Sequence, residues 1–323
     1  MRFIVVGAGA IGGVIGGRLF ESGHEVVLVA RGPHLDAIRS RGLTVASPSG
    51  TVTLRIPAVG SPEDLEFAPG DIGIIATKSQ DTWAALGALS AAPGSDTLAI
   101  ACAQNGVRNE ETALRMFENV YGICVMSPTA HSEPGVVEAY SSPVSGILDV
   151  GRYPSGADEV ATRIAEAFSS STFASVAPGD IMRFKYRKLI MNLYNALDAL
   201  LGDEPWPDEL TSAITSEATA VLAVAGIDVA TAHEDRERRG DLLTVAPVEG
   251  GGRRGGGSSW QSLERGLGSI ETDYLNGEIV LLGRLHGVPT PVNALVQRVA
   301  GEAARAKAAP GSYTASDLLA MLG

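Results

Sequence analysis

A glycine triplet between two short apolar runs is the feature that most constrains how this chain folds. Residues 3–6 are apolar and lead into Gly7, Gly9 and Gly12, a helical pattern follows, and a second apolar run covers residues 26–29. This order predicts a strand, a tight turn, a helix and a second strand, which is the setting in which G-x-G-x-x-G binds a dinucleotide. Gly7 permits the turn, Gly9 lets the backbone approach a pyrophosphate, and Gly12 lets the helix pack close to the strand.

The pyrophosphate is expected on the unpaired N–H groups at the positive end of the helix dipole. The loop residues that we expect to bind the cofactor are Gly7, Gly9, Ala10, Ile11 and Gly12. At the end of the second strand, where NAD sites usually carry an acid, the chain has Arg31 instead. A guanidinium can hold a 2′-phosphate bidentately, so NADPH is the expected cofactor. The alternative is that Arg31 is an ordinary solvated loop residue.

Length and charge restrict the classes of protein that remain. The 323 residues favour two domains, and the formal net charge of −12 argues against a nucleic-acid surface. Cys102 and Cys124 lie in apolar stretches and are expected to be reduced core thiols of a cytoplasmic protein. We expect no membrane span and no metal site, because the longest apolar runs are too short and the histidines lack ligand spacing.

Alternating strand and helix patterns through the N-terminal half predict an α/β, doubly wound domain. The runs near Val136 and Ile147 are expected to finish its sheet, and residues 43–56 to form a hairpin. Pro178 and Gly179 mark the expected boundary, which gives an N-terminal NADP-binding domain, 1–178, and a second domain, 179–323. Helical periodicity in 181–201, 209–225 and 270–286 predicts that the second domain is mostly α.

In the helix predicted over 181–201, Lys188, Asn192 and Asn195 are spaced i, i+4 and i+7, which places them on one stripe. The functional interpretation is a general acid, Lys188, with amides that orient a carbonyl substrate. The alternative is a polar outer face, with Lys185 beside it.

Other candidate residues lie at helix starts and strand ends. Ser258 and Gln261 have capping-box spacing, which would put Ser259 in a first turn that attracts a carboxylate. Glu271 would lie in the first turn of the next helix, after Ser269 as its cap, although such residues are ordinary at helix starts. Lys78 and Asn105 each follow a predicted strand of the sheet, at the end where ligands bind; Asn105 could equally be a turn residue before glycine.

Taken together, GAGAIG, TKSQ, QNG, KLIMN and SSWQSL…ETDYLNGE resemble, in this order, the ketopantoate reductase (2-dehydropantoate 2-reductase) family. The resemblance implies a Rossmann-type N-terminal domain, a helical C-terminal domain for substrate binding and dimerisation, and NADPH-dependent reduction of a 2-oxo acid, ketopantoate, to pantoate. It leaves a homodimer open.

The resemblance also implies roles for the candidate residues. Lys188 would be the general acid, and Glu271 would contact the substrate hydroxyl and the cofactor ribose. Ser259 and Asn192 would hold the substrate, with Asn195 beside them. The remaining cofactor contacts would be Arg31, Lys78 and Asn105.

Two departures from the family pattern surround the substrate. The family's second asparagine falls on Ala196, with Asn195 adjacent, and Arg108 stands where a small or apolar residue is common. The alternatives are therefore a related reductase of another oxo acid or an imine, and a dinucleotide sensor without catalysis. Lys188 and Glu271 count against the sensor, which needs neither.

The segment Gly250–Gly257 is rich in glycine and contains Arg253 and Arg254. One interpretation is a mobile lid whose arginines meet anionic ligand groups. The other is a surface linker.

Overall fold

The computed structural model describes residues 1–249 and 255–322. The chain divides into two compact units: unit 1 comprises Met1–Lys185 and Ala232–Arg254, and unit 2 comprises Tyr186–Thr231 and Gly255–Gly323. Each unit is described by itself below. The Arg253 and Arg254 pair of the predicted lid lies outside the described residues.

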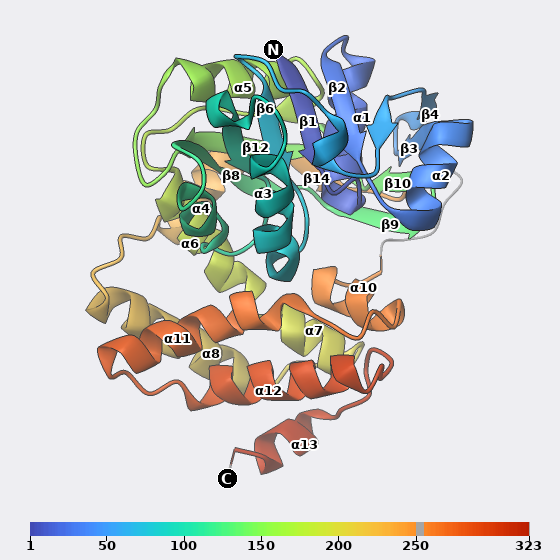
Figure 1. The fold of residues 1–323 in the computed structure, drawn as a ribbon. Coiled ribbons are helices and arrows are strands. Elements are labelled where there is room, and N and C mark those ends of the chain that lie inside the picture. The colour runs from blue at the N-terminus through green and yellow to red at the C-terminus, as the bar shows by residue number, and fades with distance from the viewer. Residues whose placement is uncertain (250–254, 323) are drawn as a thin grey trace. The chain divides into compact units, whose positions relative to one another are not determined.

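Unit 1 is built on an eight-stranded sheet with the strand order β13-β12-β8-β7-β6-β1-β2-β5 (Figure 1). Its strands are β1 (Arg2–Val6), β2 (Glu25–Val29), β5 (Ala58–Val59), β6 (Ile72–Ile75), β7 (Ala99–Cys102), β8 (Asn119–Met126), β12 (Gly146–Arg152) and β13 (Phe173–Ala174). From β5 to β8 all neighbours are parallel, whereas β12 runs antiparallel to β8. This confirms the doubly wound α/β fold class.

Both faces of this sheet are covered, which explains why its strands are continuous apolar runs. Phe3 and Val5 face one core, with α1 (Ala10–Glu21) and α5 (Glu159–Ser169). Ile4 and Val6 face the other core, with α3 (Thr82–Ser90) and α4 (Asn109–Leu114). The side chains of one strand thus alternate between two helical layers.

A second sheet corrects one sequence expectation. β3 (Leu43–Ser47) and β4 (Gly50–Leu54) form the predicted hairpin, but β10 (Val136–Ala139) joins β3 in parallel and β9 (Thr129–Glu133) joins β10. The run near Val136 therefore does not finish the main sheet. Val137 instead packs over α1, where its Cγ1 would lie 2.7 Å from a Cβ at Gly13.

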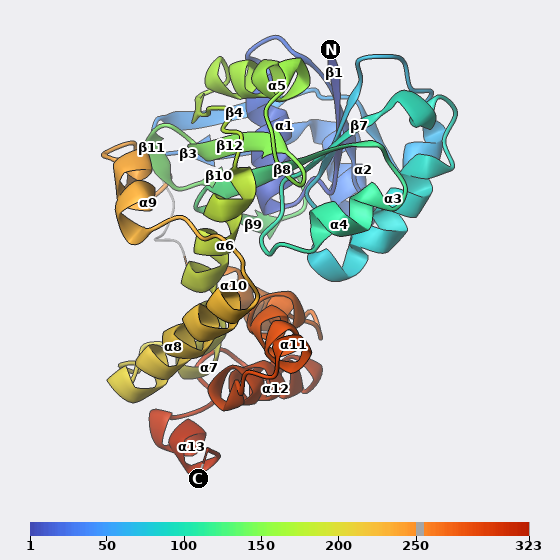
Figure 2. The same cartoon turned by 90° about the vertical axis from the view of Figure 1, so that its left-hand side faces the viewer.

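The structure also revises the domain boundary expected at residue 178. The segment from Ala232 was assigned to the helical domain, yet α9 (Ala232–Arg239; Figure 2) and β14 (Leu243–Val245; Figure 1) belong to unit 1. β14 pairs with β11 (Ser141–Pro143), and Arg238 binds the carboxylate of Asp149 at 2.8 and 2.6 Å. The sequence there is polar and rich in charge, so local patterning gave no sign of this attachment.

Unit 2 is helical, as predicted. α8 (Asp208–Val224), α11 (Asn276–His286) and α12 (Pro291–Arg305) pack together and carry most of its core, with Ile214, Ile279 and Val296 fully buried. The smaller elements are α7 (Asn195–Leu201), α10 (Ser258–Glu264), the 3₁₀ turn η4 (Glu271–Tyr274) and α13 (Ala315–Ala320).

Two helices predicted from periodicity are interrupted. The helix expected over 181–201 ends as α6 (Ile181–Asn192), and α7 restarts at Asn195 after Tyr194. The helix expected over 270–286 is η4 followed by α11, with a break at Leu275, whose φ of −113° and ψ of −92° are not helical. Periodicity of apolar residues survives such short breaks, so it did not reveal them.

Candidate functional site

The candidate cofactor residues of unit 1 follow neighbouring strands at one edge of the sheet. β1 lies between β2 and β6, and β7 follows β6, so the strand order reverses at β1. The glycine loop follows β1, Lys78 follows β6, Asn105 follows β7, and Arg31 follows β2. Parallel strands end at the same edge, and in open α/β sheets ligands bind where the strand order reverses.

The three loop glycines have different surroundings. A Cβ on Gly7, at φ +97°, would lie 2.9 Å from the amide nitrogen of Thr77, and one on Gly12 would lie 2.1 Å from the carbonyl oxygen of Gly7. A Cβ on Gly9 would meet nothing within 4 Å. Gly7 and Gly12 are thus required by the packing of the loop, whereas Gly9 leaves an open space beside the backbone.

The first turn of α1 opens onto this space. Gly9 is its N-cap and provides no side-chain hydrogen bond, and the turn that begins with Ala10 and Ile11 contains no acidic residue. The N–H groups of a first turn have no partner inside the helix. Since nothing negative competes for them, the loop fits a pyrophosphate.

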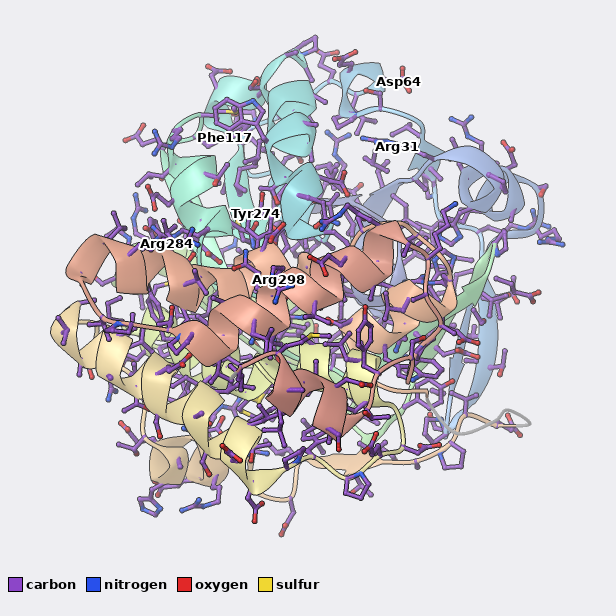
Figure 3. The ribbon with its side chains drawn as sticks, turned by 90° about the horizontal axis from the view of Figure 1, so that it is seen from below. Arg31, Asp64, Phe117, Tyr274, Arg284 and Arg298 are labelled. Carbon is purple, nitrogen blue, oxygen red and sulfur yellow. The ribbon has the colours of Figure 1, made fainter. Side chains whose placement is uncertain are left out.

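Arg31 is exposed and forms the N-cap of α2 (Gly32–Arg41) (Figure 3). Within the described part of the chain its guanidinium has no hydrogen-bond or ion-pair partner. A free guanidinium at this strand end suits a 2′-phosphate better than a ribose 2′-hydroxyl.

Lys78 and Asn105 lie in loops that buried side chains tie together. Gln104 donates from Nε2 to the carbonyl oxygen of Thr77 at 2.9 Å, and Asn109 donates from Nδ2 to the carbonyl oxygen of Asn105 at 3.0 Å. Lys78 and Asn105 are both half-buried. The two loops therefore hold one another in place.

In unit 2, Lys188 and Asn192 lie one turn apart on α6, as predicted, but Asn195 begins the separate helix α7. The single stripe of three residues is therefore wrong. Asn195 instead directs Nδ2 toward Oγ of Ser258, at 3.4 Å. Lys188 is half-buried, whereas Asn192 is 5 % exposed.

The predicted helix caps near Ser259 and Glu271 are also wrong. Gly257, not Ser258, caps α10, and its N–H donates to Asp198 at 2.5 Å. Ile270, not Ser269, caps η4. Ser259 and Glu271 nevertheless lie in first turns, as expected, and both are buried.

Two of the predicted substrate residues each have a buried polar atom without a hydrogen-bond partner among the described residues. These atoms are Nδ2 of Asn192 and Oγ of Ser259. A buried polar atom left unpaired costs about 1–3 kcal/mol, so it usually marks a place where a ligand or water completes the hydrogen bonds. One amide donor and one hydroxyl suit a carboxylate or keto oxygen.

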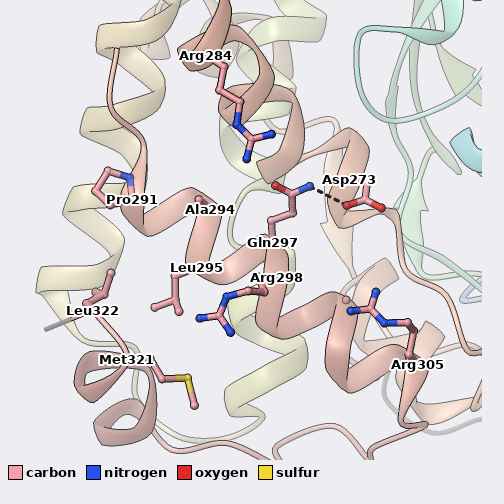
Figure 4. A pocket seen from close by; sticks show the side chains of 11 residues that line it. Asp273, Arg284, Pro291, Ala294, Leu295, Gln297, Arg298, Arg305, Met321 and Leu322 are labelled. Carbon is pink, nitrogen blue, oxygen red and sulfur yellow. Dashed lines mark hydrogen bonds between the residues drawn. The ribbon is translucent and has the colours of Figure 1, made fainter. Parts of the chain in front are cut away.

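A separate hollow of about 510 Å³ in unit 2 is lined by residues of α11 and α12 and by Met321 and Leu322 (Figure 4). Arg284, Arg298 and Arg305 line it, and Gln297 donates to Asp273 at 2.8 Å there. None of the predicted site residues lines this hollow.

Sequence reasoning missed several residues that support the site. They include His34, which contacts the glycine loop, and the buried Lys185, Glu110 and Asn109. Their signal was weak because polar residues near a turn are usually solvated.

The described residues contain no cluster of His, Cys, Asp or Glu placed to bind a metal. Within the same residues, no helix has the length and apolar character needed to cross a membrane.

Family models and known relatives match this chain over most of its length. The family model "Ketopantoate reductase PanE/ApbA" matches residues 3–154, and the model of the C-terminal part of the same family matches residues 180–304. A 2-dehydropantoate 2-reductase of Pyrococcus horikoshii is 28% identical over 303 residues, which cover 92% of this chain and 95% of that protein.

Solved structures give the same fold. The crystal structure of a PanE/ApbA family ketopantoate reductase from Ralstonia eutropha is similar with a TM-score of 0.80 and 26% identity, covering 95% of this chain and 99% of that one. D-mandelate dehydrogenase with NADH and anilino(oxo)acetate has the same TM-score at 23% identity, with 95% and 99% covered, and shows the fold alone. The chain is an oxidoreductase with a dinucleotide-binding unit and a helical unit, and it belongs to the ketopantoate reductase family.

Proposed function

We propose that this protein reduces 2-dehydropantoate (ketopantoate) to pantoate with NADPH. The observation that carries the proposal is that the family match extends over both units. The matched residues 3–154 include the glycine loop, Arg31, Lys78 and Asn105, and the matched residues 180–304 include all the proposed substrate residues. A sensor that only bound a dinucleotide would need the first part alone.

The preference for NADPH rests on unit 1. The open space beside Gly9 and the bare first turn of α1 suit the pyrophosphate, and the unpaired Arg31 suits the 2′-phosphate. Lys78 and Asn105, in the loops that follow the next two strands, would bind the remaining ribose and phosphate groups. When bound, the cofactor supplies a hydride for the keto carbon of the substrate.

The substrate chemistry rests on unit 2. Nδ2 of Asn192 and Oγ of Ser259 would orient the 2-oxo acid, and Asn195 would assist. Lys188 would stabilise negative charge on the keto oxygen and donate a proton to it as the alcohol forms. The carboxylate of Glu271 would accept a hydrogen bond from a substrate hydroxyl and from the cofactor ribose.

A different 2-oxo acid is the second candidate substrate. Ala196, at the position of the family's second asparagine, is 1 % exposed and brings no polar group to a ligand. A substrate with fewer hydroxyl groups than ketopantoate would tolerate that loss.

One assay distinguishes these substrates. The purified protein is given NADPH and a panel of 2-oxo acids with and without branched hydroxyl-bearing side chains, and cofactor oxidation is followed by absorbance. We expect the highest kcat/KM with ketopantoate. A higher kcat/KM with another 2-oxo acid of the panel would replace ketopantoate as the proposed substrate. The absence of turnover with every member would reject the proposed reductase activity.

The cellular setting is a proposal as well. Cys102 and Cys124 are buried and form no disulfide, which suits the reducing cytoplasm. The acidic net charge of −12 supports a small-molecule partner rather than a nucleic acid. A homodimer stays a prediction.

A further inference from the structure

A fully buried ion pair lies beside the cofactor loops of unit 1. Nζ of Lys185 is 2.6 Å from Oε1 of Glu110, and the two side chains are 2 % and 0 % exposed. Lysine and glutamate are almost never buried to this extent, because taking both charges out of water costs more than most pairs return. From the sequence, Lys185 was considered only as a neighbour of an alternative polar outer face, so its burial calls for a reason.

The lysine holds two backbone carbonyls. Its Nζ donates to the carbonyl oxygen of Gln104 at 2.9 Å and to that of Ile123 at 3.2 Å. The contact with Glu110 is an ion pair rather than a hydrogen bond, because neither carboxylate oxygen of Glu110 has a hydrogen-bond partner among the described residues. Lys185 is therefore enclosed by one carboxylate and two carbonyls, unlike the half-buried Lys188.

The next carbonyl along the chain is held in the same way. Asn109 donates from Nδ2 to the carbonyl oxygen of Asn105 at 3.0 Å and to Oγ of Ser79 at 3.2 Å. Its Oδ1 accepts from the hydroxyl of Thr82 at 2.9 Å. Two consecutive carbonyls, those of Gln104 and Asn105, are thus turned toward buried side chains.

The side chain of Gln104 extends this network to the other loop. Its Nε2 donates to the carbonyl oxygen of Thr77 at 2.9 Å and to Oγ1 of Thr82 at 2.7 Å. Gln104, Thr82 and Asn109 are each buried. The side chain of Asn105, by contrast, makes no hydrogen bond within the described residues.

We propose that Lys185 and Asn109 are positioning residues of the dinucleotide site, which hold the two carbonyls of the Gln104–Asn105 turn so that the Asn105 side chain is presented to the cofactor. The inference rests on the proposed function only in taking the ligand as a nicotinamide dinucleotide. An apolar pair could fill the same volume with equal or greater stability, but it could not hold a carbonyl. The ion pair is therefore explained by the geometry of the turn rather than by stability.

The test separates stability from positioning. Lys185→Met alone would leave the Glu110 carboxylate buried without its partner, so the principal variant is the double substitution Lys185→Met with Glu110→Leu. We expect its Tm to stay close to that of the unaltered protein, while the Kd for NADPH, measured by titration without substrate, rises about tenfold, as for one lost hydrogen bond. Amide hydrogen exchange at residues 104–107 should become faster.

Two further variants complete the test. Asn109→Ala probes the same turn without a buried charge and should also raise the Kd for NADPH. Arg115→Met removes an exposed ion-pair partner of Glu111, at 3.2 Å, from the C-terminal end of α4 and should leave the Kd for NADPH unchanged. A folded double variant, or a folded Asn109→Ala, that binds NADPH as tightly as the unaltered protein would overturn the proposal.

Because this readout needs no turnover, it is independent of the substrate. A protein that binds NADPH but does not reduce ketopantoate would reject the proposed reaction and leave the positioning roles intact. If the protein binds NADH instead, the same titration with NADH tests the same turn.

Discussion

The imidazole of His34 lies 2.7 Å, through Nε2, from the carbonyl oxygen of Ala8 in the glycine loop. Its Nδ1 accepts the N–H of Gly135 at 2.9 Å. Since Nδ1 is an acceptor, the proton of the neutral ring is on Nε2, which donates to Ala8. A second proton on Nδ1 would face the N–H of Gly135, so the loop is braced by the neutral form of the ring.

This arrangement predicts a loss of stability in mild acid. Burial lowers the pKa of His34 below its ordinary 6.5, although the bond to Ala8 acts in the opposite direction. Below about pH 6.5 the unfolded chain takes up a proton that the folded protein resists, so the free energy of unfolding falls as the pH falls toward the folded-state pKa. Denaturant unfolding at a series of pH values from neutral to mildly acidic measures this change in the free energy of unfolding.

The matched variant is His34→Gln, which cannot titrate. Its stability should depend less steeply on pH over the same window. His24, whose pKa is also lowered by burial, is present in both proteins and cancels in the comparison. Parallel curves for the two proteins would show that His34 contributes nothing to the acid response.

Two glycine substitutions in one loop should separate folding from binding. Gly12→Ala puts a Cβ 2.1 Å from a backbone oxygen and should destabilise the fold by about 1–3 kcal/mol. Gly9→Ala meets no protein atom within 4 Å, so its stability should change by less than about 0.5 kcal/mol while NADPH binding weakens. Thermal unfolding and NADPH titration of both variants are the measurements, and a Gly9→Ala protein with unchanged affinity would place the dinucleotide elsewhere.

Cofactor preference should depend on Arg31. Arg31→Ala should raise the KM for NADPH roughly ten- to a hundredfold, since a charge-assisted bond contributes about 1.5–3 kcal/mol, with little change for NADH. The control is Arg39→Ala, which removes another exposed guanidinium of α2, bonded to the carbonyl oxygen of Ala58. Equal use of NADPH and NADH by the unaltered protein would contradict the assignment.

Lys188→Ala should lower kcat by about 10²–10⁴-fold, the usual scale for general acid catalysis. NADPH affinity should change little, because the interaction strengthens only as the alcohol forms. The exposed Lys307→Ala provides the control for loss of a lysine. Near-normal turnover of the Lys188 variant would show that this ammonium is not the proton donor.

The sequence was most informative where local signals and fold agree. Gly7, Gly9 and Gly12 predicted the loop after β1, and each has the surroundings expected of it. The sheet that a strand joins is determined by contacts between residues far apart in the sequence. The local sequence therefore did not predict that β10 pairs with β3. The same is true of Lys185, whose burial depends on Glu110, a residue distant in sequence.

Helix-cap residues show a second limit of prediction from the sequence. Ser258 and Gln261 have capping spacing, but Asp198 provides an acceptor for the N–H of Gly257, and the helix begins one residue earlier than a cap at Ser258 predicts. An acceptor far away in the sequence, Asp198, thus binds the backbone N–H at the start of this helix in place of a local side chain. The sequence placed Ser259 and Glu271 in first turns, whereas the structure supplies the burial that makes the unpaired Oγ of Ser259 notable.

The return of α9 and β14 to unit 1 has a consequence for how the protein is made. The chain leaves unit 1 after Lys185 and re-enters it at Ala232, so a ribosome that has released only the first 185 residues has not yet supplied Arg238. Until Arg238 is synthesised, the carboxylate of Asp149, which is only 7 % exposed in the complete unit, has no guanidinium to bind. The dinucleotide-binding unit therefore cannot be completed during synthesis before much of the helical unit has emerged, and a gene fragment cut at residue 178 would encode all eight strands of the main sheet but neither β14 nor Arg238.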